Sequence, residues 1–148
     1  MTIWTDRLDS IQAGQATKPT VVEILRLPDI VSWEPGQVVT KWETDEDFFT
    51  TGGQLFGGYL GALADQVMGH TAMSVLEDEN AFRTAQMNVT FYRPVRKGVL
   101  WITGKVTHKT RQAIHVQVEF TDADGTPMCS VSGIQIVFPR SPRSTPPR

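Results

Sequence analysis

Hydrophobic and polar residues alternate along most of the second half of the chain. Between Thr84 and Tyr92 the apolar positions are Ala85, Met87, Val89 and Phe91. The same period of two returns in residues 99–108, 113–121 and 127–138, and turn-forming stretches such as Asp122-Ala123-Asp124-Gly125 separate these runs. Because successive side chains of a strand point to opposite faces, the pattern predicts four antiparallel strands.

The first half of the chain predicts shorter elements. Residues 1–19 set a few apolar side chains in a polar background, which favours an amphipathic helix ending near Gly14. Residues 20–27 form a second short helix or an extended segment. Trp33-Glu34-Pro35-Gly36 is a turn signal, and residues 37–44 alternate again, so they predict one further strand.

Residues 56–69 interrupt the alternation and indicate a central helix. Gly57 and Gly58 open this stretch, and apolar residues occupy most of the helical circumference. We therefore expect a helix from about residue 58 to 75 or 76 that is buried nearly all round. Asp65 lies two turns in, and its neighbours at helical spacing are small: Gly58, Gly61, Ala62, Gly69 and Ala72.

Asp65 has two interpretations on the helix alone, because a carboxylate buried without a partner is costly. In one, a local donor or an arginine satisfies it, and its role is structural. In the other, it is a general base or nucleophile that faces a groove cleared by the small residues. The backbone N–H of Gly57, at the start of the helix, would then polarise a substrate carbonyl.

Composition narrows the class of protein. A chain of 148 residues with 40% hydrophobic and 20% charged residues suits one ordinary globular domain. The formal net charge of -2 argues against a general nucleic-acid binder. One cysteine and three scattered histidines predict no disulfide, metal site or cofactor. No long apolar run or signal-peptide core is present, so we expect a cytoplasmic protein without a membrane segment.

The order of these features resembles one family. A curved antiparallel sheet wrapped around one long helix is an α+β arrangement that describes the hotdog fold. The glycine pair, Asp65, the strand Met87-Asn88-Val89-Thr90-Phe91-Tyr92-Arg93-Pro94-Val95, its Lys97-Gly98 exit and the 122–125 turn follow the order of hotdog acyl-CoA thioesterases. The chain is most similar to the PaaI-like group of the 4-hydroxybenzoyl-CoA thioesterase superfamily. The resemblance covers residues 36–138, between an N-terminal extension, residues 1–35, and a tail, residues 139–148, that we expect to be disordered.

The resemblance implies a set of catalytic residues. The family's acid lies eight residues after the first glycine, which is the place of Asp65, and Thr84 matches a Ser or Thr that helps to hold the attacking water. Gly57 supplies the backbone donor. Phe56 occupies the place of a family histidine, so the ring's hydrogen bond is lost, and Phe56 instead packs on the acyl or pantetheine chain. Gln54 is the candidate for a polar loop residue before the glycine pair.

The remaining candidates concern substrate binding. Coenzyme A carries phosphates, so we expect contact from the basic residues at two turns, Arg93, Arg96, Lys97 and Arg111. Solvated turn charges are the alternative for each of them. Gly58, Tyr59 and Asn88 complete the predicted substrate-binding set.

Helix geometry adds a constraint on the site. Gly57 and Asp65 are eight residues apart, or about 12 Å along a helix at roughly 1.5 Å per residue. One thioester carbon cannot contact both within about 3 Å. We therefore expect a homodimer with antiparallel central helices and composite sites, and the resemblance implies a homotetramer built from two dimers.

Two functions of different classes follow. The first is an acyl-CoA thioesterase that releases a free acid and coenzyme A. The second is a non-catalytic hotdog module that binds acyl-CoA or a fatty acid as a sensor or carrier, an alternative that the loss of the family histidine at Phe56 keeps open. Asp65 separates them, because a pure binder has little reason to keep a carboxylate beside its ligand.

Overall fold

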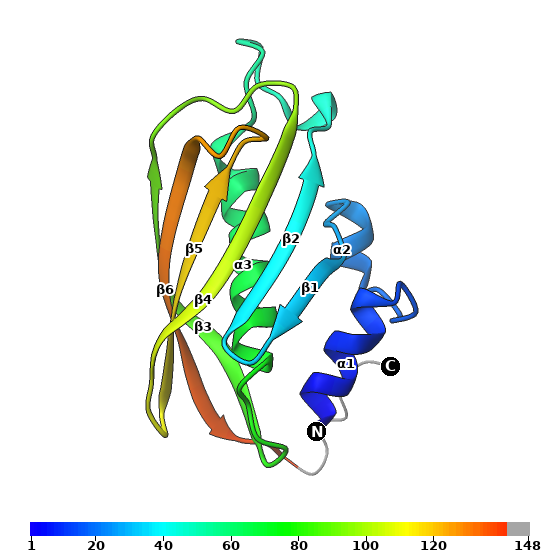
Figure 1. The fold of residues 1–148 in the computed structure, drawn as a ribbon, viewed down its shortest axis with the longest axis vertical. Coiled ribbons are helices and arrows are strands. Elements are labelled where there is room, and N and C mark those ends of the chain that lie inside the picture. Colours follow the sequence, from blue (N-terminus) through cyan, green and yellow to red (C-terminus); the bar gives the residue numbers. More distant parts are fainter. Residues whose placement is uncertain (142–148) are drawn as a thin grey trace.

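The computed structural model describes residues 1–141, and the predicted disordered tail lies largely outside these described residues. Its helices are α1 (Ile3–Gln12), α2 (Thr20–Ile24) and α3 (Gly57–Met73), with a 3-10 turn, η1 (Glu46–Phe48). Its strands are β1 (Ile30–Glu34), β2 (Gln37–Glu43), β3 (Asn80–Phe91), β4 (Val99–Lys109), β5 (Ala113–Thr121) and β6 (Pro127–Pro139). The strands form one antiparallel sheet in the order β1-β2-β4-β5-β6-β3, and α3 lies along one face of it (Figure 1). This is the predicted hotdog arrangement.

Strand β1 is the element that the sequence pattern missed. It pairs with β2 through Glu34 and Gln37, so the turn predicted at residues 33–36 is the tip of a hairpin. Gly36 has a φ of 85°, which a glycine adopts without strain. The described sheet therefore has six strands instead of the five expected, because a strand of only five residues carries too few positions to show alternation.

Two glycines let α3 lie close to the sheet. A Cβ on Gly133 of β6 would come 2.8 Å from Met68 Sδ and 2.9 Å from the backbone oxygen of Gln86. A Cβ on Gly104 of β4 would come 2.9 Å from a methyl group of Val67. Because Met68 and Val67 are almost completely buried, these glycines are sites of close helix-to-sheet packing.

The expectation that α3 is buried nearly all round is wrong. The side facing the sheet is buried, but Gly58 and Asp65 are exposed, and Gly61 and Ala62 are half-buried. The helix therefore keeps one open side along its first two turns. Small residues on that side leave Asp65 accessible from outside the protomer.

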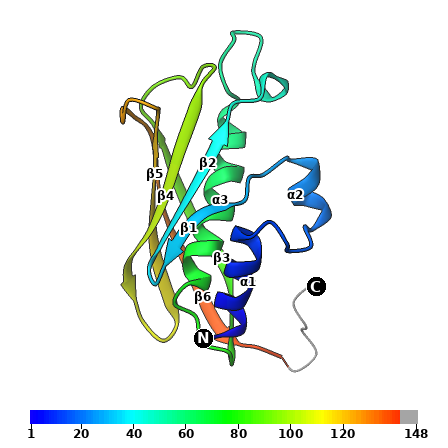
Figure 2. The same cartoon turned by 45° about the vertical axis from the view of Figure 1, so that its right-hand side comes forward.

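The N-terminal extension packs on the same core as the rest of the chain. Figure 2 shows α1 and α2 on the side of α3 that faces away from the sheet. Leu8 and Ile11 of α1 are buried beside Ile30 and Val38 of the β1–β2 hairpin. The indole nitrogen of Trp4 donates hydrogen bonds to the backbone oxygens of Glu77 and Asn80. Residues 1–29 thus contribute a second layer over α3, whereas β1 adds an edge strand to the sheet.

Candidate active site

A groove between α3 and strand β3 holds the central candidate residues. Its walls are Gly57, Gly58, Gly61, Ala62 and Asp65 from the helix, and Met87, Val89 and Phe91 from the strand. β3 is an edge strand, since β6 is its only neighbour in the described sheet. The groove is therefore open along its length, and the sequence-predicted Gly57 and Asp65 lie on the same wall.

Thr84 contacts Asp65 across this groove. Its hydroxyl lies 2.8 Å from Asp65 Oδ1, a hydrogen bond between a neutral donor and a carboxylate. Within the described residues, Asp65 has no lysine or arginine at ion-pair distance. The interpretation of Asp65 as a structural partner of an arginine is therefore excluded for this part of the chain.

A β-bulge turns Thr84 towards Asp65. The pairing of β3 with β6 shifts between Thr84 and Gln86, so Ala85 has no partner. Met87, Val89 and Phe91 face the groove as the alternation predicted, and without a bulge Thr84 would point to the opposite face from them. The simple alternation put Ala85, and not Thr84, on the same face as Met87, and this prediction is wrong. The extra residue at the bulge reverses the alternation and puts Thr84 beside Asp65.

Gln135 is a site residue that the sequence analysis missed. It is completely buried in β6, and its Oε1 lies 3.1 Å from the Thr84 hydroxyl oxygen. Its Nε2 has no hydrogen-bond partner among the described residues. A hydroxyl donates only one proton, so it cannot serve both Asp65 and a glutamine oxygen. With the amide turned, Nε2 donates to Thr84 and the hydroxyl donates to Asp65, which satisfies both contacts.

The sequence carried a signal for this glutamine. Inward positions of β6 alternate as Val131, Gly133, Gln135 and Val137, and all four are buried. A glutamine in such a series is the one member that needs a hydrogen-bond partner. Its partner is Thr84 of β3, a strand more than 40 residues away in the chain. Only the strand order of the sheet makes β3 a neighbour of β6.

The start of α3 is free of side-chain caps. Phe56 occupies the N-cap position and makes no capping hydrogen bond, and the first turn contains no acidic residue. The N–H groups of Gly57 and Gly58 have no acceptor within the helix. Phe56 is 61% exposed, and its ring lies over Gly58, where a Cβ would come 2.7 Å from it. The helix start therefore presents amide donors beside an apolar ring.

Gln54 lies near this helix start. It lines a second hollow with Gly57, Leu60 and the segment from Phe91 to Val95. Arg93 lines the same hollow, and its guanidinium donates to the backbone oxygen of Pro127 at 2.8 Å. Gln54 and Arg93 are thus positioned to reach a ligand that enters from this end.

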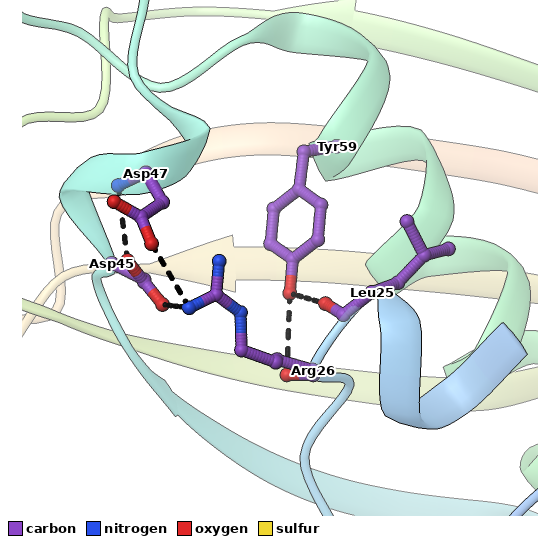
Figure 3. A network of polar contacts seen from close by, with 5 residues as sticks. All are labelled: Leu25, Arg26, Asp45, Asp47 and Tyr59. Carbon is purple, nitrogen blue, oxygen red and sulfur yellow. Dashed lines mark hydrogen bonds and ion pairs between the residues drawn. The ribbon is translucent and has the colours of Figure 1, made fainter. Parts of the chain in front are cut away.

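Tyr59 has a packing role in the structure instead of the predicted substrate contact. Its side chain is buried, stacks on Phe48 at 4.1 Å between ring centroids, and donates from its hydroxyl to the backbone oxygen of Leu25 at 2.8 Å. Arg26 pairs with Asp45 and Asp47 at 3.0 and 3.1 Å (Figure 3). Burial raises the pKa of Tyr59 to about 12. This network ties α2 to the start of α3.

Asn88 and Arg111 do not join the groove of their own protomer. Asn88 points to the opposite face of the sheet from Met87 and Val89, where it lines a shallow hollow with Gln117 and Ser132. Arg111 comes directly after β4, a strand about 33 Å long. The length of this strand separates Arg111 from the turn that precedes β4. Arg96 and Lys97 lie in that turn, and Lys97 Nζ is 3.8 Å from Glu46. The basic residues thus form two separate groups.

Other titratable residues take no part in the groove. Burial and the charge of Arg7 lower the pKa of His70 to about 4, and His70 Nδ1 has no hydrogen-bond partner within residues 1–141. Burial and the charge of Glu119 raise the pKa of Cys129 to about 11. Among the described residues, no three His, Cys, Asp or Glu side chains group as metal ligands. No helix in that part of the chain has the length and apolarity needed to cross a membrane.

The fold is of the hotdog type, and comparison with known proteins gives the family of the chain. The model of the Thioesterase superfamily matches residues 52–129. A presumed esterase of Saccharolobus solfataricus is 32% identical over 119 residues, which cover 79% of this chain and 84% of the relative. The chain therefore belongs to the thioesterase superfamily, a family of thioester hydrolases.

Solved structures share the fold. A presumed thioesterase of Ralstonia eutropha, related to phenylacetic acid degradation, superposes with a TM-score of 0.78 at 24% identity, over 88% of this chain and 98% of the other. A thioesterase-like protein of Streptococcus pneumoniae, solved with coenzyme A, has a TM-score of 0.73 at 22% identity, over 80% and 91% of the two chains. These likenesses confirm the hotdog fold.

Proposed function

We propose that the protein hydrolyses an acyl-CoA thioester, with Asp65 as the general base or nucleophile. The observation that carries the proposal is the 2.8 Å hydrogen bond from Thr84 to Oδ1 of an exposed aspartate that has no ion-pair partner in the described residues. That bond leaves Oδ2 of Asp65 open to the groove. The family and the coenzyme A held by the S. pneumoniae protein support the choice of thioester.

The oxyanion donor is the Gly57 N–H of a second copy of the chain. Within one protomer, Gly57 and Asp65 are about 12 Å apart along α3, too far for one carbonyl to reach both. A two-fold axis beside the helix places the start of one α3 next to the middle of the other. The open side of α3 and the unpaired edge of β3 support this assembly, since Met87, Val89 and Phe91 lie there and Phe91 is 54% exposed.

The reaction needs only groups that this dimer brings together. The N–H of Gly57 donates to the thioester oxygen while a water, held by Asp65 and Thr84, attacks the carbonyl carbon. Asp65 takes the water's proton, and the tetrahedral intermediate expels the coenzyme A thiolate, which is reprotonated. Alternatively, Asp65 Oδ2 attacks directly, and water then hydrolyses the resulting anhydride. Single turnover in ¹⁸O water detects an anhydride that water opens at the Asp65 carbonyl, because only that route puts label into Asp65 and leaves the released acid unlabelled.

Coenzyme A enters from the Gln54 end of the groove. Arg93 supplies positive charge there, and Gln54 supplies a neutral hydrogen-bonding group. The Arg96 guanidinium lies nearby, beside Gly53. Phe56, exposed and without a polar group, packs on the pantetheine chain. Arg111, at the other end of the sheet, reaches the same nucleotide only from the partner subunit.

Release of free thiol from a panel of acyl-CoAs tests the proposal. We expect turnover of at least one member, and a loss of about 10²–10⁴-fold in kcat for Asp65→Asn with binding retained. Light scattering of the same samples gives the subunit count, for which we expect a dimer or the dimer of dimers. Tight binding without turnover by the unaltered protein would instead support a carrier or sensor, which the apolar Phe56 favours. An active Asp65→Asn variant would also contradict the proposal.

A further inference from the structure

A cavity of about 230 Å³ lies between α3 and the N-terminal segment that covers it. Its outer wall is drawn from residues 7–29. Its inner wall is the middle and the end of α3, through Asp65, Gln66, Gly69, His70 and Met73. Figure 2 shows these two layers facing each other on the side of α3 away from the sheet. The cavity therefore lies outside the core that α3 forms with the sheet.

The lining of the cavity is polar for an enclosed space in a small protein. About half of the lining residues are polar or charged. Thr17 and Lys18 are exposed, so the cavity opens to solvent on their side. The Lys18 ammonium lies 3.4 Å from Asp29, which lines the same opening. Pockets for apolar ligands are lined predominantly by apolar side chains. The lining therefore indicates polar contents.

Two side chains of α3 carry buried polar atoms at the cavity wall. Gln66 donates from Nε2 to the backbone oxygen of Pro28 at 2.9 Å, but its Oε1 has no hydrogen bond within the described residues. His70 is 9% exposed, and its Nδ1 also lacks a partner in residues 1–141. Because they are four residues apart, Gln66 and His70 lie on the same side of α3. A buried polar atom is costly unless a hydrogen bond satisfies it, and buried water commonly supplies that bond.

The chemistry of these two atoms suits water. Burial and the charge of Arg7 lower the pKa of His70 to about 4, so its ring is neutral at pH 7. Gln66 Oε1 can only accept, whereas a neutral imidazole nitrogen either donates or accepts. A water molecule does both, so it satisfies either atom. At about 30 Å³ for each water, the cavity has room for several of them.

Asp65 lines the cavity as well as the groove. A thioester that reacts at Asp65 fills the groove, which limits the approach of water from that side. The cavity offers a second approach. His70 lies five residues beyond Asp65, or about 7.5 Å along the helix at roughly 1.5 Å per residue. Two or three waters at hydrogen-bond distance span that length.

We propose that this cavity is a water passage that supplies the hydrolytic water to Asp65 while the substrate fills the groove, and that Gln66 and His70 are positioning residues for this water. The proposal rests on the proposed function. In the general-base route, the water oxygen bonds to the acyl carbon and Asp65 takes one of the water's protons. The carbon–sulfur bond breaks, and the thiolate takes that proton. In the anhydride route, the same water enters after coenzyme A has left.

Substitutions of increasing size at Ala16, in the outer wall, test the passage. The measurement is the rate constant for release of the free acid in a single turnover, which includes the water step in both routes. This rate should fall in the order Ala16→Val, Ala16→Leu, Ala16→Phe, and by about tenfold or more in the last. The affinity for non-hydrolysable acyl-CoA thioethers should stay unchanged, and the loss should be the same for every acyl length. Ala13→Phe, at an exposed position of the same segment, should keep the full rate.

Two further variants separate a blocked passage from a general loss of stability. Met73→Ala opens the inner wall, so it should restore most of the rate that Ala16→Phe loses, whereas two merely destabilising changes would add. His70→Phe keeps a ring of similar size and removes its nitrogen atoms. It should slow acid release by about three- to tenfold, the effect of one lost hydrogen bond to water, without changing thioether affinity. His115→Phe is the matched control and should be neutral.

The outcomes distinguish this proposal from the proposed function. Equal rates of acid release in the unaltered protein, the Ala16 series and His70→Phe, all shown to be folded by thermal unfolding, would overturn the water passage and leave the thioesterase intact. A loss that changes with acyl length, or a weaker thioether affinity, would show that the cavity holds the substrate and would also overturn it. Absence of turnover by the unaltered protein with every acyl-CoA would overturn the thioesterase, and the water passage with it.

Discussion

The hydroxyl of Thr84 lies 2.8 Å from Oδ1 of Asp65, although 19 residues separate them in the chain. The bulge at Ala85 makes this contact geometrically possible, since it reverses the direction of alternation along β3. The contact fixes one carboxylate oxygen, and in the proposed mechanism the other one takes part in the reaction. Its loss should therefore impair chemistry more than binding.

Thr84→Val should lower kcat by about 10- to 100-fold with little change in KM, because it removes a hydrogen bond to a charged group worth about 1.5–3 kcal/mol. Thr84→Ser keeps the hydroxyl and should retain most activity. Thr90→Val, in the same strand beside Ser130, is the matched control and should be neutral. Steady-state kinetics of the three variants check this, and a fully active Thr84→Val would show that the hydroxyl has no catalytic role.

Gln135→Met should also lower kcat, since the buried amide orients the Thr84 hydroxyl towards Asp65. Methionine conserves the volume, so folding should be preserved. Combined with Thr84→Val, it should add little further loss, because both changes break one chain of hydrogen bonds. Gln135→Glu should be worse than Gln135→Met, since a carboxylate competes with Asp65 for the hydroxyl proton. Additive losses in the double variant would argue that Gln135 acts independently of Thr84.

Stability should fall below pH 6.5 through His70. The unfolded chain binds a proton at the ordinary histidine pKa of about 6.5, whereas the folded protein does so at about 4. Between these values the unfolded state holds the extra proton, so the free energy of unfolding drops as the pH falls, by up to about 1.4 kcal/mol per unit. Urea unfolding at pH 6.5 and 5 measures it. Between pH 6.5 and 5, the free energy of unfolding should drop by about 1.5 kcal/mol less in His70→Gln than in the unaltered protein. The control His115→Gln should show the same drop as the unaltered protein.

Gly133→Ala should destabilise the fold by more than 2 kcal/mol, because the added methyl group overpacks against Met68 and the rigid backbone at Gln86. Gly69→Ala is the comparison, since its Cβ would lie 3.6 Å from Phe82, an ordinary contact distance. Alanine also favours a helix by up to about 1 kcal/mol over glycine. In chemical denaturation, Gly133→Ala should be less stable than the unaltered protein and Gly69→Ala more stable. Equal stabilities of the two variants would contradict the packing argument.

Tyr59→Phe should cost about 1 kcal/mol of unfolding free energy, since it leaves the Leu25 backbone oxygen without its hydroxyl donor. Tyr92→Phe, at a side chain that is 51% exposed, should change stability by less than about 0.5 kcal/mol. Proteolysis within residues 13–29 should quicken only in Tyr59→Phe, because that contact holds α2 against α3. Equal cleavage of both variants would show that the Tyr59 hydroxyl does not hold α2 against α3.

The sequence by itself determined the elements and their class. Period-two alternation and turn residues located β2 to β6, and the glycine pair followed by an apolar stretch located α3, because these signals depend on residues close together in the chain. The same local reasoning identified Asp65 and Gly57, whose spacing along one helix is fixed by helical geometry. It also set the roughly 12 Å between them, on which the proposal of a second subunit rests.

The tertiary structure decided which side chains meet. It brought Thr84 to Asp65 through a bulge, placed Gln135 behind them from another strand, and turned Tyr59 and Asn88 away from the groove. It also folded residues 1–29 over α3 to enclose the cavity beside the acid. These arrangements depend on strand order and on the register of pairs distant in sequence. A local pattern contains no record of either, since one inserted residue reverses every side chain that follows it.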